Sequence, residues 1–129
     1  MSEPDTSFKP IAALPEIRAL LDEAPDVLKQ DISRAKNLLA DPDATLPVDV
    51  VAFTLEEAKG ALDLLALHAR QLQRWQHEQI SDAERAEVTS LQAVIPEIRP
   101  LIQRLIALAT ELDKRARTGI ASRRKMWRH

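Results

Sequence analysis

Apolar residues in the last third of the chain recur at alternating intervals of four and three residues without a gap. The pattern is made by Leu91, Ile95, Ile98, Ile102, Leu105, Ala109, Leu112 and Ala116. This spacing places every member on one face of an α-helix, so it predicts a long helix over about residues 82–118. Pro96 and Pro100 fall off that face, and we expect them on the solvent side, where they kink the helix without breaking its apolar stripe. Gly119 is a natural residue to end the helix.

A second stripe with the same spacing occupies the middle of the chain. It consists of Leu55, Ala58, Leu62, Leu65, Ala69 and Leu72, and it predicts a helix over about residues 55–80. Thr54 is followed three residues later by Glu57, and Ser81 by Glu84. Both pairs match the capping box, in which a hydroxyl and a carboxylate bond each other's backbone N–H groups, so each pair predicts a helix start.

The first forty residues carry shorter apolar segments that are separated by prolines. Pro15 suits the first position of a helix, and Pro25 is expected to interrupt or kink that helix because it pushes the preceding residue out of the α region. Residues 41–53 begin with Asp-Pro-Asp and contain three valines and a phenylalanine. We therefore expect a loop there that lies across the bundle and caps its core.

These segments define the expected fold and its boundaries. No stretch alternates with a period of two, so no sheet is predicted. The sequence predicts an all-α bundle of four or five helices built on the two long ones. A single helical domain over residues 1–119, followed by a basic C-terminal tail over residues 120–129, accounts for the whole chain.

Composition excludes several classes of function. The chain of 129 residues has no cysteine, two glycines and four aromatic residues. Disulfides, thiolate zinc sites, cysteine nucleophiles and glycine-rich phosphate loops are therefore ruled out. His68 and His77 have no carboxylate or imidazole three or four residues away, so we expect no metal site and no cofactor.

The chain also lacks the signals of a membrane or secreted protein. No apolar run approaches the roughly 18 residues that a spanning helix needs, and the acidic N-terminus has no apolar segment of the secretory type. We expect a cytoplasmic protein without a membrane association. The bias toward alanine, leucine and arginine suggests a bacterial source.

Charge is distributed unevenly along the chain. Residues 1–63 carry 13 acidic and 6 basic side chains, whereas residues 64–129 carry 7 acidic and 12 basic ones. The basic tail combines a stacking aromatic with cations that can pair with phosphates, namely Arg123, Arg124, Lys125, Trp127 and Arg128. Weak nucleic-acid binding through this tail is one prediction. The other is a solvated tail in which Met126 and Trp127 dock onto the bundle or onto the acidic first half of the chain.

Residues 61–69 are apolar nearly all round the helix, with only Asp63 and His68 polar. Such a helix is covered on more than one side, which indicates a protein partner or a second copy of the chain. The predicted interface residues are Leu64, Leu67, His68 and Trp75. The leading hypothesis is accordingly a non-enzymatic helical interaction or assembly module, and the alternative is a nucleic-acid-associated accessory subunit.

One pair of residues suggests an enzyme. Arg70 and His77 lie close together on the predicted middle helix, and their spacing resembles the arginine–histidine motif of the all-helical HEPN ribonucleases. The resemblance implies that His77 acts as a general acid or base and that Arg70 orients the scissile phosphate. Gln71 stands where that family commonly has asparagine, so the resemblance lies in the spacing alone. A HEPN-like ribonuclease therefore remains a remote alternative.

Overall fold

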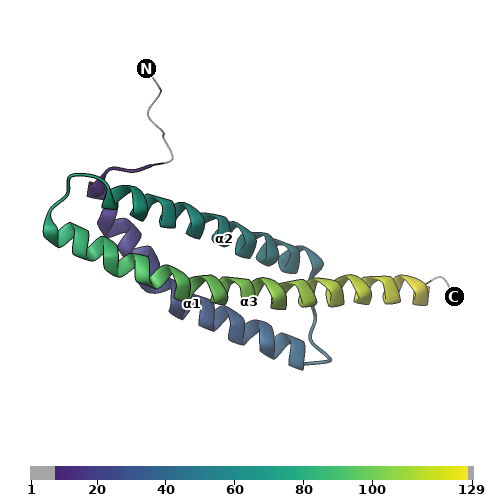
Figure 1. Ribbon diagram of the computed structural model, residues 1–129. Coiled ribbons are helices and arrows are strands. Elements are labelled where there is room, and N and C mark those ends of the chain that lie inside the picture. Colours follow the sequence, from purple (N-terminus) through teal and green to yellow (C-terminus); the bar gives the residue numbers. More distant parts are fainter. Residues whose placement is uncertain (1–7, 128–129) are drawn as a thin grey trace, which may run out of the picture.

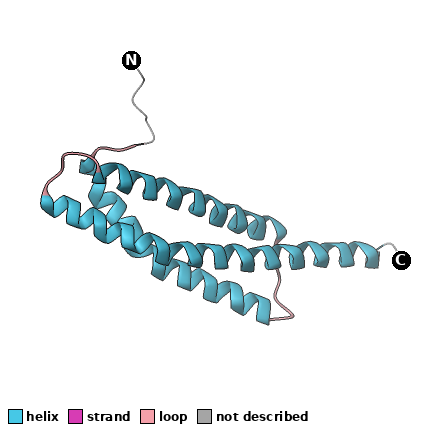
Figure 2. Ribbon diagram, viewed as in Figure 1, coloured by secondary structure: helices cyan, strands magenta, loops and turns pink. Residues whose placement is uncertain are grey.

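Three long α-helices make up almost all of the protein (Figure 1). The computed structural model describes the backbone of residues 8–127 and the side chains of residues 8–119. A short 3-10 helix, η1 (Ile11–Ala13), leads into α1 (Leu14–Ala40), which is followed by α2 (Val48–Gln76) and α3 (Asp82–Trp127). Figure 2 shows no strand in this part of the chain, as predicted. The prediction of four or five helices is wrong, because there are three.

Helix α1 runs through Pro25 without interruption. The buried stripe of this helix continues on both sides of the proline, with Leu21 before it and Leu28 after it. Burial of apolar side chains against the rest of the protein thus stabilises the helix across the one missing backbone hydrogen bond. The sequence-based expectation of a break or kink at this position accounts for one of the surplus helices.

Helix α2 begins earlier than the sequence predicts. Pro47 is its extended N-cap residue, and the expected capping loop over 41–53 is therefore confined to residues 41–47. Val51 is buried in the core, so the first turn of α2 is held by packing. The Thr54 hydroxyl donates to the carbonyl of Val50 at 2.9 Å, which places Thr54 inside the helix and not at its N-cap.

The turn between α2 and α3 follows the second predicted capping box. The backbone N–H of Ser81 donates to Glu84 Oε1 at 2.9 Å, and the backbone N–H of Glu84 donates to Ser81 Oγ at 3.1 Å. Arg85 reaches back from α3 and donates to the carbonyls of Gln76 and Glu78. The arginine thereby satisfies carbonyl groups that the end of α2 leaves without helical partners.

The structure of α3 confirms the predicted helix and its apolar face. All eight stripe residues from Leu91 to Ala116 are buried, and the helix is continuous through Pro96 and Pro100, both of which are exposed. The predicted end at Gly119 is wrong, because α3 continues to Trp127. Gly119 does not take the positive φ of a terminating glycine.

The three helices are arranged around α3. Helices α1 and α2 each pack along α3 but have little contact with each other. They are closest at the start of α1 and diverge toward the end where α3 projects beyond them (Figure 1). In a four-helix bundle, this arrangement corresponds to two diagonal helices and the helix between them. The fourth corner, opposite α3, is left open.

Candidate functional site

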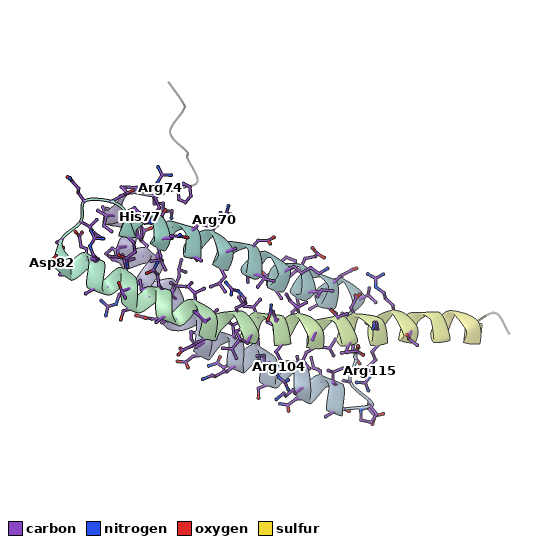
Figure 3. The ribbon with its side chains drawn as sticks, in the orientation of Figure 1. Arg70, Arg74, His77, Asp82, Arg104 and Arg115 are labelled. Atoms are coloured by element: carbon purple, nitrogen blue, oxygen red, sulfur yellow. The ribbon has the colours of Figure 1, made fainter. Side chains whose placement is uncertain are left out.

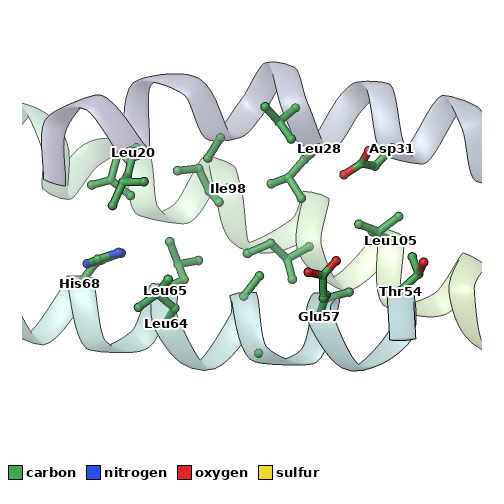
Figure 4. A pocket seen from close by; sticks show the side chains of 17 residues that line it. Leu20, Leu28, Asp31, Thr54, Glu57, Leu64, Leu65, His68, Ile98 and Leu105 are labelled. Carbon is green, nitrogen blue, oxygen red and sulfur yellow. The ribbon is translucent and has the colours of Figure 1, made fainter. Parts of the chain in front are cut away.

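An apolar groove occupies the open fourth corner. Its walls come from α1 and α2, and its floor is formed by α3 with Ile98, Ile102 and Leu105. The groove has a volume of about 450 Å³. Figure 4 shows Leu20 on α1 facing His68, Leu64 and Leu65 on α2 across this space. The core of the protein is therefore reachable from one side.

Each wall carries a stripe of residues at helical spacing. The stripe of α1 is Leu20, Ala24, Val27 and Asp31, and the stripe of α2 is Thr54, Glu57, Ala61, Leu64 and His68. These positions recur at intervals of three and four, so each stripe runs straight along its helix beside the buried one. Large apolar side chains in the groove keep much of their surface in water: Leu20 is 53% exposed, Val27 50% and Leu64 48%.

The groove is acidic at one end. Asp31 on α1 and Glu57 on α2 line it from opposite walls, and both carboxylates point into the space between the helices (Figure 4). Asp31 Oδ1 also lies 3.6 Å from Arg34 Nη1 on the same helix. No lysine or arginine is among the described residues that line the groove. A cation on a bound molecule would therefore be attracted to this end.

His68 lines the opposite end of the groove. The pKa of its imidazole is lowered, mainly by burial and further by the positive charge of Lys9. Desolvation of this kind favours the neutral ring. At neutral pH the groove therefore has an uncharged end at His68, an apolar middle and an acidic end at Asp31 and Glu57.

The structure divides the predicted interface residues. Leu64 and His68 line the groove, whereas Leu67 is exposed outside it. Trp75 is fully buried, so its side chain is not accessible to a partner, and its place among the interface residues is corrected. The residues of α1 that form the facing wall were missed, although the spacing of Leu20, Ala24, Val27 and Asp31 was visible in the sequence.

Trp75 is covered by the segment that precedes η1. Its indole Nε1 donates to the carbonyl of Lys9 at 3.0 Å, and the backbone N–H of Lys9 donates to Gln71 Oε1. The guanidinium of Arg74 lies over the Phe8 ring at 4.5 Å. Hydrogen bonds in both directions and a cation–π contact thus hold this segment on the end of α2.

The arginine–histidine pair lies on the same end of α2 but on the surface. Figure 3 shows Arg70 and His77 with Arg74 near this end of the molecule, and both Arg70 and His77 are exposed. No hydrogen bond joins them in the part of the chain that the structure describes. The structure therefore gives the ribonuclease interpretation no support beyond the sequence spacing of Arg70 and His77.

The basic tail lies on the last turns of α3, where only the backbone is described. The helical bounds include Arg123, Arg124, Lys125 and Trp127, whose side chains lie outside the described part, as does all of Arg128. Among residues 8–119, no cluster of three or more histidine, aspartate or glutamate side chains is placed to hold a metal ion. In the described helices, no segment is long and apolar enough to cross a membrane.

The fold and the groove together define a three-helix protein with one helix position open. Comparison of the chain with protein-family models, with curated proteins and with solved structures gives no match.

Proposed function

We propose that the protein is a non-enzymatic interaction module that binds a helix of a protein partner in the groove between α1 and α2. The observation that carries this proposal is the apolar surface of Leu20, Val27 and Leu64, which lies together in one groove above a floor of core residues. Exposed apolar residues that gather in a groove mark interaction sites, whereas single ones do not. The proposed location of the protein is the bacterial cytoplasm.

The shape of the groove favours a helix as the bound element. Its walls are two helices with straight stripes at intervals of three and four, and its floor is a third. A fourth helix would meet all three by the packing that holds four-helix bundles together. Complete burial of a leucine or valine side chain stabilises by about 1.5–3 kcal/mol, so burying the exposed half of each contributes about 1 kcal/mol.

Site-specific photo-cross-linking tests this function in living cells. A photoreactive amino acid at Leu64 should give a discrete covalent adduct with another polypeptide, because that position lines the groove. Ala66 is the matched control, since it is exposed on the same helix but does not line the groove. The proposal fails if position 64 gives no adduct, or if position 66 gives the same adduct with equal yield.

Alanine variants of neighbouring leucines separate binding from folding. Leu65 is buried, and Leu65→Ala should lower the free energy of unfolding by about 2–5 kcal/mol. Leu64→Ala should change it by no more than about 0.5 kcal/mol while weakening the binding of a partner. Urea unfolding measures the first effect, and the yield of cross-linking from a second groove position, Val27, measures the other.

A second candidate function is the binding of nucleic acid by the basic C-terminal half. The observation that favours it is the extension of α3 to Trp127, which puts Arg123, Arg124 and Lys125 on a helix beyond the ends of α1 and α2. Four phosphate contacts, with Arg128 included, predict a log–log salt slope of roughly −3 for single-stranded RNA in mobility-shift assays. Absence of any shift at low salt rules this function out.

A further inference from the structure

We infer that the acidic end of the groove binds the C-terminal end of α3 from a second copy of this chain. This inference rests on the proposed function, because it names the partner of the same groove. Each copy would place its own α3 end in the groove of the other, which gives a dimer with twofold symmetry. Complementary charge, the direction of α3 and its length support this pairing.

The charges of the two elements are complementary. The acidic end of the groove presents Asp31 and Glu57 from opposite walls, without a lysine or arginine in its described lining. Asp31 pairs with Arg34 on its own helix at 3.6 Å, whereas Glu57 has no ion pair among the described residues. The last acidic residue of the sequence is Asp113, and the residues after it include seven lysines and arginines. In the described structure, Arg117 is paired with Asp113 and Lys114 with Glu111. The cations that come later, from Arg123 onward, have no acidic residue near them in the sequence.

The end of α3 cannot reach the groove of its own copy. Arg115 donates to the carbonyls of Leu38, Leu39 and Asp41 at 3.0–3.1 Å, which fixes this part of α3 beside the end of α1. Beyond Arg115 the helix continues straight past α1 and α2 (Figure 1). Because α3 also forms the floor of the groove, only the α3 end of another molecule can enter it.

The direction and length of the projecting helix suit this pairing. Asp31 and Glu57 lie on the halves of α1 and α2 nearer the projecting end, because α1 ends and α2 begins there (Figures 1 and 4). Two copies that meet at these ends bring each α3 toward the acidic end of the other groove. Arg115 lies beside the end of α1, so residues 116–127 project by about 18 Å at 1.5 Å per residue. Asp31 lies nine residues before the end of α1, which is about 14 Å inside the groove. The last turn of a projecting α3 therefore reaches the acidic end of the other groove.

Sedimentation of the 129-residue chain tests the inference with a matched pair of substitutions. Glu57 lines the groove, whereas Glu56 is an exposed carboxylate on the adjacent position of α2 that pairs with Lys59 at 3.6 Å. We expect a monomer–dimer equilibrium that weakens as salt rises. Glu57→Gln should raise the dimer dissociation constant by about two- to thirtyfold, because it removes an exposed charge pair at both symmetric contacts. Glu56→Gln should leave the constant unchanged.

Cysteine pairs test the contact directly, since the natural chain has no cysteine. Chains carrying Glu57→Cys are mixed with chains carrying Lys125→Cys or Trp127→Cys and are oxidised under native conditions. We expect a mixed disulfide dimer with at least one of the two, because bridged Cα atoms must lie within about 7 Å. Glu56→Cys, mixed with the same chains, should give none.

The outcomes separate this inference from the proposed function. A chain that stays monomeric at high micromolar concentration and low salt overturns the inference, as does equal disulfide formation from positions 56 and 57. If such a monomeric chain still gives the Leu64 adduct with a different protein, the inference fails and the proposed function stands. If Leu64 gives no adduct of any kind, the proposed function fails. A monomer that binds RNA through its α3 end also overturns the inference.

Discussion

Replacement of Trp75 measures how strongly the segment before η1 is held on the end of α2. The side chain is 0% exposed, so Trp75→Ala removes a large buried ring and should lower the free energy of unfolding by about 3–5 kcal/mol. Trp75→Phe keeps most of the ring but removes the hydrogen bond to the carbonyl of Lys9, which is 3.0 Å long. The loss of that bond should cost about 1 kcal/mol.

Urea unfolding, followed by far-ultraviolet circular dichroism, gives both values without relying on tryptophan fluorescence. The control is a chain that lacks residues 1–9, which has no Lys9 carbonyl to accept the bond. In that chain the difference between Trp75 and Trp75→Phe should shrink by about 1 kcal/mol, because a hydrogen bond is no longer lost. A cost below about 1 kcal/mol for Trp75→Ala would refute the burial of this side chain.

Three further predictions concern the helices and the groove. Pro96→Ala and Pro100→Ala should each raise the free energy of unfolding, measured in urea, by up to about 2 kcal/mol. Both prolines are exposed, and each change restores a helical hydrogen bond. Destabilisation by both changes would mean that α3 is not continuous there. Arg115→Gln should destabilise by about 1–2 kcal/mol, since it removes hydrogen bonds to three carbonyls at the end of α1. Because the pKa of His68 is lowered in the folded protein, the unfolded state binds more protons. The free energy of unfolding should therefore fall as the pH drops through about 6.5. His68→Gln should make the free energy of unfolding less dependent on pH in this range.

Much of α3 could be predicted because the information is local. The intervals from Leu91 to Ala116 define one apolar face, and a helix is the only regular structure that brings those residues together. The exposed positions of Pro96 and Pro100 follow from the same count. The capping box at Ser81 is equally local, since its two hydrogen bonds join residues three positions apart.

Predictions failed where packing overrides a local signal. Pro25 and the Thr54 capping box both indicate helix boundaries in the sequence, yet α1 and α2 continue through them. Apolar residues on either side, such as Leu21 and Val51, are buried against the rest of the protein. The free energy gained by burying these side chains exceeds the cost of a proline or an unused cap within the helix. The burial depends on neighbours that are distant in the sequence.

The sequence by itself determined that this protein is helical and which face of each helix is apolar. It also indicated that the middle of α2 needs cover on more than one side. Only the tertiary structure decided which apolar positions are covered. Helices α1 and α2 pack on α3 and not on each other, so Leu64 faces Leu20 across an open groove, whereas Lys9 covers Trp75 at the end of α2. The physical reason is that periodicity defines a face, but the element that covers the face comes from residues far away along the chain.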